Sequence, residues 1–273
     1  MDFLSILLLS LFIVGLIIII ISIKHNKIDL KNSDSKLYKN NDRETYFATL
    51  VHDLKTPAFA QIRTMDLLLK GYFGKLNDTQ TQVIKETLAS EKYMADIVTN
   101  ILTTYKCEEN KLKLEISCFD AADVLNSLYN SIKPLADENN QIININYHCS
   151  NLFCFGDKLQ ISRVMNNLIS NAIKYGFKDS IINVNLNIND YQLEFNVENQ
   201  GHPIPKLKLD KIFEKYTGGM AHYNSASTGL GLYLSKRIIE LHKGKIYAKS
   251  SNNGKCVFGF VLPSKSKNLL PSK

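Results

Sequence analysis

The sequence lacks the signatures of two common classes of phosphate-binding protein. No GxxxxGK[ST] segment occurs in its 273 residues, which excludes a P-loop nucleotide site. The net charge of +7 comes from lysines spread along the chain, without the aromatic-interleaved basic patch that is typical of nucleic-acid-binding surfaces. We therefore expect no nucleic acid among the partners of this protein.

Cysteines are too few and too scattered for a disulfide framework. The chain has 5, an odd number, which suits free thiols in a reducing compartment. His148, Cys149 and Cys154 lie close together in sequence and suggest a metal site. No second ligand pair follows at a usable spacing, so structural thiols are the favoured interpretation.

Long apolar runs without a charged residue are absent apart from Phe3–Ile23, which leucine and isoleucine dominate. About 21 residues at about 1.5 Å each match the hydrocarbon core of a bilayer, about 30 Å thick. A cleaved signal peptide is the alternative. Because the run exceeds the usual apolar region, no basic segment precedes it and no small-x-small cleavage site follows, we expect an uncleaved membrane anchor.

The charges that flank this run predict its orientation. Asp2 precedes it, and Lys24, Lys27 and Lys31 follow it, so residues 1–2 should lie outside and the rest in the cytoplasm. We expect a single-pass protein of the inner (cytoplasmic) membrane, in contact with lipid, whose catalytic part is cytoplasmic. With so little chain outside, no extracellular sensor domain is expected.

Residues 42–70 have the periodicity of an amphipathic helix. Its apolar positions are Phe47, Leu50, Leu54, Ala58, Ile62, Met65 and Leu69. His52 lies more than about 90° from this stripe, with Asp53 beside it and Thr56 one turn later. Pro57 is expected to interrupt the helix, at a cost of about 3 kcal/mol. A plain surface histidine is the commoner interpretation of such a segment, but the kink beside His52 favours a functional one.

A second helix should follow and form a hairpin with the first. Gly71 and Gly74 end the first helix, and Asn77 or Asp78 can cap the next. The apolar positions of the second helix are Ile84, Leu88, Met94, Ile97, Val98, Ile101, Leu102 and Tyr105. Because a hairpin with one apolar face cannot bury that face alone, we expect two copies to pair as a four-helix bundle.

The sequence pattern changes at residue 110, after which short strand-like runs alternate with helical stretches. Residues 110–263 are therefore predicted to form an α+β domain with one mixed sheet and helices on one face. The expected helices are Ala121–Asn139, Lys158–Tyr175 and Leu230–His242. The expected strands are Leu112–Ile116, Ile142–Tyr147, Ile182–Ile188, Leu193–Val197, Lys245–Ala248 and Val257–Leu262.

The helix Lys158–Tyr175 combines a buried face with a polar one. Asn167, Asn171 and Lys174 fall within about 60° of each other, opposite the apolar positions. Amide oxygens suit Mg²⁺ and lysine neutralises phosphate, so this patch can hold a metal–phosphate group. A merely solvated helix face is an equally good interpretation of this helix alone.

Two glycine-bearing segments follow. The segment Val197–Pro205 is predicted to be the end of a strand followed by a turn. The later segment Gly218–Thr228 has few large apolar residues, which is typical of a mobile lid. Gly229-Leu230-Gly231-Leu232 then opens a helix, where backbone N–H groups can approach phosphates. A simple turn and cap is the alternative for so short a glycine pair.

Taken together, the order and spacing of these motifs resemble the sensor histidine kinases of two-component signalling. The segment His52–Pro57 looks like their phosphoacceptor box, and Asn167–Tyr175 looks like their asparagine box. The boxes that contain Phe213 and Gly229–Leu232 follow in the family order, and Gly254–Pro263 resembles the closing strands.

The resemblance covers Asp42–Pro263 and implies an ATP-binding fold of the Bergerat type. This fold is shared with gyrases, Hsp90 chaperones and mismatch-repair ATPases, and the upstream histidine box is what selects a kinase. The implied organisation is an outside terminus (1–2), a transmembrane helix (3–23), a juxtamembrane linker (24–41), a dimerisation and phosphoacceptor domain (42–109), a catalytic ATP-binding domain (110–263) and a tail (264–273).

The resemblance also implies ATP-dependent phosphorylation of His52 within a homodimer, followed by transfer to an aspartate of a response regulator. Asn171 would hold Mg²⁺. The residues implied around ATP are Asn167, Asn171, Lys174, Tyr175, Asn199, Gly201, Ile204, Phe213, Thr228, Gly229, Leu230, Gly231 and Leu232. Asp53 would accept a proton from His52, and Thr56 resembles the residue that orients water for dephosphorylation of the regulator.

One box departs from the family pattern. The family usually has Asp-x-Gly-x-Gly after the strand, whereas Asn199 and Pro203 here replace the aspartate and the second glycine. Asparagine keeps an acceptor oxygen and adds a donor, so adenine recognition remains feasible. The departure keeps two alternatives open, a pseudokinase scaffold and an ATPase of the wider superfamily that forms no phosphohistidine.

Overall fold

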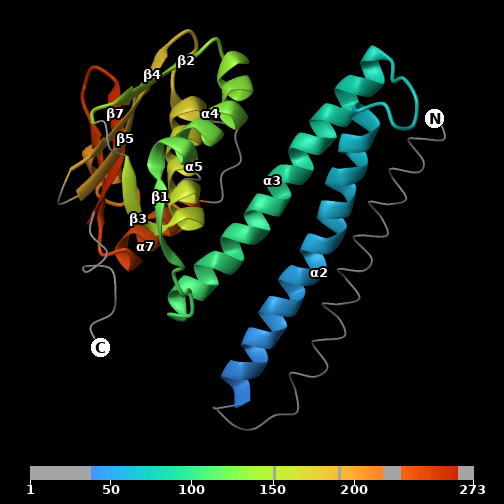
Figure 1. Cartoon of the computed structure of the whole chain (residues 1–273), viewed down its shortest axis with the longest axis horizontal. Coiled ribbons are helices and arrows are strands. Elements are labelled where there is room, and N and C mark those ends of the chain that lie inside the picture. The colour runs from blue at the N-terminus through green and yellow to red at the C-terminus, as the bar shows by residue number, and fades with distance from the viewer. Residues whose placement is uncertain (1–37, 150–151, 190–191, 218–228, 264–273) are drawn as a thin grey trace. The chain divides into compact units, whose positions relative to one another are not determined.

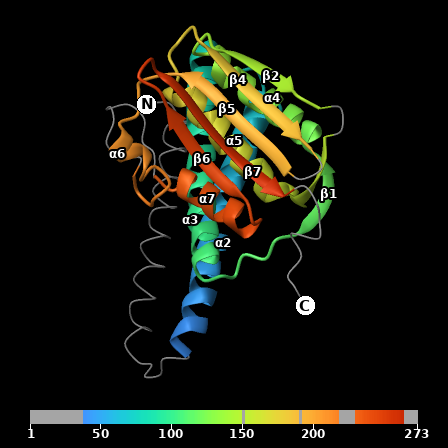
Figure 2. The same ribbon diagram turned by 90° about the vertical axis from the view of Figure 1, so that its left-hand side faces the viewer.

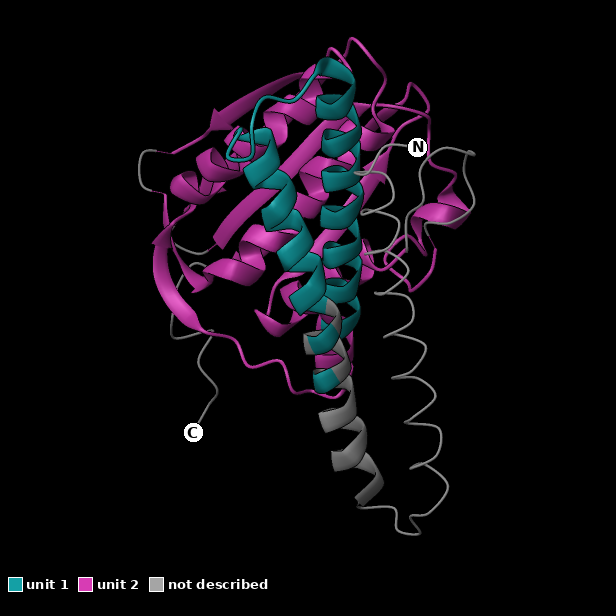
Figure 3. Cartoon of the chain, turned by 90° about the vertical axis from the view of Figure 1, so that its right-hand side faces the viewer, with its two compact units in different colours: residues 1–102 teal, residues 103–273 magenta. Residues whose placement is uncertain are grey.

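The computed structural model describes residues 38–149, 152–189, 192–217 and 229–263. The chain divides into two compact units, residues 1–102 and 103–273 (Figure 3). Within the described ranges, no helix combines the length and apolarity that a membrane crossing requires. The predicted anchor, most of the predicted linker, Thr228 and the predicted tail lie outside the described residues.

The first unit is the predicted helical hairpin. It consists of α2 (Tyr38–Leu69) and most of α3 (Asp78–Glu108) (Figure 1). The helix predicted over residues 42–70 is confirmed, and α2 continues through Pro57. Proline removes one backbone donor, and the hydrogen bonds of the neighbouring turns keep the helix continuous across that gap.

A small apolar cluster and a capping box stabilise the hairpin at its turn. Met65 packs with Ile84 and Leu88 across the two helices. Of the two candidate caps for α3, the structure selects Asn77: its Oδ1 accepts from the Gln80 N–H at 2.8 Å, and its own N–H donates to Gln80 Oε1 at 3.0 Å. Such reciprocal bonds satisfy donors that a helix start would otherwise leave unpaired.

The second unit is an α+β sandwich. Its five-stranded sheet has the order β2-β4-β5-β7-β6, and only the β2–β4 pair is parallel. Its strands are β2 (Ile142–Tyr147), β4 (Ile181–Ile188), β5 (Gln192–Gln200), β6 (Lys245–Ser250) and β7 (Lys255–Pro263). Its helices are α4 (Ala121–Asp137), α5 (Lys158–Tyr175), α6 (Lys206–Leu209) and α7 (Gly231–Leu241). Helices α4, α5 and α7 cover one face of this sheet, which confirms the predicted mixed sheet (Figure 2).

A separate two-stranded sheet was not predicted. Strand β1 (Ile116–Asp120) pairs antiparallel with β3 (Phe153–Asp157). The predicted strand over Leu112–Ile116 is wrong, because the pairing begins where Ile116 meets Asp157 and continues only C-terminally. A short strand exists where a partner strand lies alongside it, and local sequence does not specify that partner.

The core lies between the five-stranded sheet and its helices. All six apolar positions predicted for α5 are at most 3% exposed: Val164, Met165, Leu168, Ile169, Ala172 and Ile173. They pack with alternate residues of the central strands, such as Val184 and Phe195. Asn199 follows Phe195 and Val197 in this alternation, so it belongs to the helix-covered face and is only 4% exposed.

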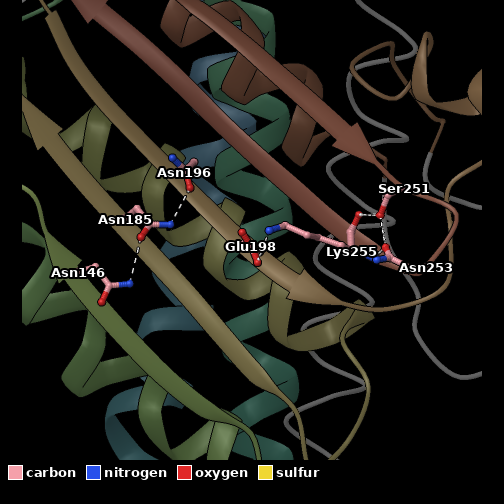
Figure 4. A network of polar contacts seen from close by, with 7 residues as sticks. All are labelled: Asn146, Asn185, Asn196, Glu198, Ser251, Asn253 and Lys255. Carbon is pink, nitrogen blue, oxygen red and sulfur yellow. Dashed lines mark hydrogen bonds and ion pairs between the residues drawn. The ribbon is translucent and has the colours of Figure 1, made fainter.

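The opposite face of the sheet is polar. Figure 4 shows a ladder of carboxamides across three strands, in which Asn146 donates to Asn185 at 3.0 Å and Asn185 donates to Asn196 at 2.9 Å. Lys255 forms an ion pair with Glu198 at 2.7 Å on the same face. These cross-strand pairs suit a face that no described helix of this unit covers, and they help to fix the register of the strands.

Asp157 and His242 join the start of α5 to the end of α7. Asp157 Oδ1 caps α5 by accepting from the Gln160 N–H at 3.0 Å. The Asp157 N–H donates to His242 Nε2 at 3.0 Å, while His242 Nδ1 lies 2.8 Å from the Ile238 carbonyl oxygen and so donates to it. This pattern requires a neutral imidazole, and burial lowers the pKa of His242 below 6.5.

We predict that stability falls as the pH drops below 6.5, because His242 then binds a proton in the unfolded chain but resists one in the folded chain. Thermal unfolding over a pH series should show this loss, and His242→Gln should flatten it. The variant should also cost about 1–3 kcal/mol at neutral pH, since the buried Asp157 N–H loses a well-placed acceptor. An unchanged pH profile in His242→Gln would contradict this assignment, with His148→Gln as the matched control.

Candidate functional site

The predicted polar residues of α5 form a line along that helix. Asn167 and Asn171 are half-buried, and Lys174 and Tyr175 are exposed near the C-terminal end. Asn167 donates from Nδ2 to Ser235 Oγ of α7 at 2.9 Å. The alternative of a merely solvated helix face is therefore wrong for Asn167, which contacts a second helix. Lys174 Nζ lies 5.5 Å from the centre of the Tyr175 ring.

The start of α7 lies against one end of this line. A Cβ atom on Gly231 would be 2.5 Å from Asn167 Oδ1, so only glycine allows this close approach. Gly229 has a φ of 66° and its carbonyl accepts from the Tyr216 N–H at 3.2 Å, which brings the turn that contains half-buried Phe213 toward α7. Leu230 provides no side-chain cap for α7. N–H groups in the first turn of a helix are suitable partners for an anionic ligand.

The other end of the α5 line meets the end of β5. Gly176 forms a bridge with Gly201, and the Phe177 N–H donates to the Gln200 carbonyl at 2.8 Å. A Cβ on Gly201 would lie 2.5 Å from the Tyr175 carbonyl oxygen and 3.2 Å from Asn199 Nδ2. These contacts hold the Asn199 carboxamide beside the C-terminal turn of α5.

The turn after β5 is anchored at Ile204, whose N–H donates to Ser250 Oγ at 2.9 Å. Pro203 precedes this bond, and the ring of His202 packs edge-on against Phe177 at 5.0 Å between ring centres. The turn is therefore held in place beside Asn199, although it lacks the second glycine of the Asp-x-Gly-x-Gly pattern.

The structure thus brings the predicted residues together in two groups at the two ends of α5. Asn167, Leu230, Gly231 and Leu232 lie where α5 and α7 meet, and Tyr175, Asn199 and Gly201 lie where α5 and β5 meet. Eight residues of helix, about 12 Å, separate Asn167 from Tyr175. This geometry suits an elongated ligand with an anionic end at α7 and a flat polar group at Asn199. Asn171, between the groups, can offer an amide oxygen to a divalent cation.

Sequence reasoning missed three contact residues of this site: Ser235, Gly176 and Gln141. Ser235 lies inside a helix and Gln141 before a strand, and neither belongs to a motif. Gln141 donates from Nε2 to the carbonyls of Ile173 and Phe177, both at 3.1 Å. The signal that could have pointed to Gly176 is its position just after the last apolar turn of α5, where glycine often ends a helix.

The histidine box lies on α2 of the first unit. Asp53 and Thr56 are exposed on this helix, whereas the side chain of His52 lies outside what the structure describes. Among the described residues no three His, Cys, Asp or Glu side chains are grouped to hold a metal ion, so the alternative metal site near His148 is not supported. All five cysteines are free, as predicted.

Within the second unit, Glu108 at the end of α3 contacts residues on both sides of the segment 218–228. Its carboxylate accepts from Tyr233 Oη at 3.0 Å and forms an ion pair with Lys215. Lys215 Nζ also lies 5.3 Å from the centre of the Tyr233 ring. The hydrogen bond to Lys215 is the main cause that lowers the pKa of Glu108, and the bond from Tyr233 adds to it.

Comparisons with known proteins agree on one family. Residues 156–266 match the model of the histidine kinase-, DNA gyrase B-, and HSP90-like ATPases. The chain is 28% identical over 244 residues to hybrid signal transduction histidine kinase A of Dictyostelium discoideum, which covers 83% of this chain and 11% of the relative. It is 27% identical over 220 residues to the sensor protein CzcS of Cupriavidus metallidurans, which covers 80% of this chain and 45% of the relative.

Solved structures agree. The catalytic domain of the histidine kinase ThkA superposes with a TM-score of 0.50 at 26% identity and covers 56% of this chain and 99% of that domain. ThkA in complex with the response regulator TrrA is similar in fold, with a TM-score of 0.50 at 21% identity. This match covers 87% of the present chain and 69% of the ThkA chain. The chain spans less than half the length of the two curated relatives described above.

We predict that Glu108→Gln destabilises the second unit slightly at neutral pH. The lowered pKa of Glu108 means that its contribution is present above 4.5 and is lost as the pH falls through its folded-state pKa. Because the groups are partly exposed, the effect should be below about 1 kcal/mol and should shrink in high salt. Urea unfolding of wild type, Glu108→Gln and the exposed control Glu109→Gln measures it. A difference that persists at pH values well below 4.5 would contradict this interpretation.

Proposed function

Since the chain belongs to the histidine kinases that have a GHKL-type ATP-binding domain, we propose that it is a membrane-bound sensor kinase. It phosphorylates His52 with ATP and passes the phosphoryl group to an aspartate of a response regulator. One observation carries this proposal: the chain joins a helix with the His52-Asp53 pair to a domain of the matching ATPase family. A catalytic role for that pair distinguishes this proposal from the two alternatives, the scaffold and the ATPase without phosphohistidine.

The two groups of residues at the ends of α5 recognise different parts of ATP. Backbone N–H groups of Gly231 and Leu232 bind phosphate oxygens at the start of α7, together with Asn167 and Lys174. Asn199 and Gly201 receive adenine at the other end. The Mg²⁺ that accompanies ATP would be held by the amide oxygen of Asn171 and would neutralise phosphate charge.

Phosphoryl transfer needs little from the protein beyond positioning and charge neutralisation, because its transition state is loose. A neutral imidazole nitrogen of His52 attacks the γ-phosphorus, the bond from that phosphorus to the bridging oxygen breaks, and ADP leaves. Asp53 accepts the proton from the other ring nitrogen, which raises the nucleophilicity of His52.

The partners follow from the hairpin and from the relatives. Apolar side chains of the hairpin remain exposed in the single chain, among them Phe59, Val83, Tyr93, Met94 and Ile101 at 41–56%. Such surface favours pairing of two copies as a four-helix bundle. The complex of ThkA with TrrA supports a response regulator as the second partner, and the apolar run Phe3–Ile23 supports a single membrane anchor with the catalytic part in the cytoplasm.

We predict that the full chain, incubated with γ-labelled ATP and Mg²⁺, acquires an acid-labile, base-stable label that His52→Gln abolishes. The reason is that a phosphoramidate forms on an imidazole nitrogen that glutamine lacks. His148→Gln, which changes an exposed histidine of the second unit, is the control and should keep the label. ATP hydrolysis without label would favour the ATPase, and neither label nor hydrolysis would favour the scaffold.

Thr56 gives a separate prediction about the reverse activity. If its hydroxyl orients the water that attacks the phosphoaspartate of the regulator, Thr56→Ala should slow regulator dephosphorylation by about tenfold or more while His52 is still phosphorylated. Release of phosphate from labelled regulator measures the rate. Thr64→Ala removes an exposed hydroxyl that donates to the Ala60 carbonyl of its own helix, and it is the matched control. Equal rates for both variants and wild type would refute the role of Thr56.

A further inference from the structure

The short helix α6 presents a leucine to solvent. Leu207 is 84% exposed, and no other large apolar side chain in the described part of the chain is as exposed. Leu209 is half-buried, and α6 lies against strand β6. Since residues two positions apart on a helix point about 160° away from each other, Leu207 lies on the side of α6 that faces away from Leu209 and is open to solvent.

Lysines flank this leucine on both sides. Lys206 and Lys208 are its direct neighbours, and Lys211 follows in the turn that continues α6, where its N–H donates to the Lys208 carbonyl at 3.1 Å. All three lysines are exposed, and no ion pair between described residues involves them. Asp210 is the only acidic residue in 204–213, so most of this positive charge is uncompensated. We call Lys206, Leu207, Lys208 and Lys211 the α6 surface.

The α6 surface has the chemistry of a contact with an anionic lipid bilayer. Lysine side chains near anionic headgroups gain electrostatic energy. An apolar side chain between them can enter the boundary between the headgroups and the acyl chains. An acidic protein surface would also pair with the lysines, but it would need a matching apolar pocket for Leu207, whereas the acyl chains receive a leucine without one.

The proposed membrane anchor keeps a bilayer within reach of the second unit. Residues 24–37 separate the apolar run Phe3–Ile23 from α2, and even fully extended they span at most about 50 Å. Because α2 and α3 form a hairpin and have 32 and 31 residues, α3 returns to the end of the hairpin from which the anchor leads. A lipid contact that is weak in solution gains strength when a tether keeps the two surfaces close together.

We propose that the α6 surface binds anionic lipid headgroups of the membrane that holds the anchor, with Leu207 inserted between them. This inference rests on the membrane anchor of the proposed function and adds a second contact between the chain and the bilayer. The contact is lost on a zwitterionic bilayer, which attracts lysines little, and it weakens in high salt, which screens exposed charges.

Hydrogen–deuterium exchange of the full chain in lipid nanodiscs tests this proposal. Nanodiscs of phosphatidylcholine alone are compared with nanodiscs that also contain phosphatidylglycerol. The backbone amides of residues 206–211 should exchange about threefold or more slowly in the anionic nanodiscs, and high salt should abolish the difference. The double variant Lys206→Gln/Lys208→Gln should lose this protection, and Leu207→Ser should reduce it. These side chains are exposed, so the variants should fold as wild type.

The matched control is Lys158→Gln/Leu159→Ser at the start of α5. Leu159 is 69% exposed but has only one lysine beside it, so this variant should keep the protection of residues 206–211. Equal exchange in the two kinds of nanodisc, with the chain inserted in both, overturns the proposal alone. So does a difference that persists in Lys206→Gln/Lys208→Gln.

Two further measurements separate this inference from its alternatives. Protection of residues 206–211 by added polyglutamate, but not by anionic nanodiscs, would assign the α6 surface to an acidic protein and overturn the lipid proposal. A chain that inserts into neither kind of nanodisc overturns the membrane anchor of the proposed function as well. Labelling of His52 by γ-labelled ATP in the same samples reports the kinase activity independently of the exchange at α6.

Discussion

The position of helix α5 depends on hydrogen bonds at its two ends, and the arrangement of the site depends on α5. At the N-terminal end, Asp157 caps the helix while its own N–H donates to the buried His242 of α7. At the C-terminal end, the amide of Gln141 takes up the carbonyls of Ile173 and Phe177. A helix end left without such partners inside a protein would leave orphaned backbone groups. Because the partners come from distant parts of the chain, they fix α5 against both the sheet and α7.

This constraint explains why glycines occur where they do. Gly231 allows α7 to approach Asn167, and Gly176 and Gly201 allow the carboxamides of Gln141 and Asn199 to lie against the last turn of α5. In each case a Cβ would meet an atom that is already held by a hydrogen bond or by the backbone. The glycines are therefore packing requirements at both ends of one helix. The positions of the α7 backbone donors and of the Asn199 carboxamide follow from the same close contacts.

The sequence predicts α5 well and its surroundings poorly. Its bounds, Lys158–Tyr175, and its six buried positions follow from apolar periodicity, which is a local property that burial enforces. The β1–β3 pair and the bond from Asn167 to Ser235 join residues far apart in sequence, and no periodicity reports them. The helix through Pro57 is also predicted from apolar periodicity, although proline disfavours a helix interior.

The replacement of the usual aspartate by Asn199 is physically consistent with the rest of this site. A carboxylate at a position only 4% exposed would need strong compensation for its lost hydration, and no cation is among the atoms closest to Gly176 and Gly201. A carboxamide has no charge to desolvate and still presents an acceptor, provided that its orientation is fixed. Aspartate does not need such fixing, because its two oxygens are equivalent. The replacement therefore lowers the cost of burying the side chain at position 199 and keeps a hydrogen-bond acceptor there.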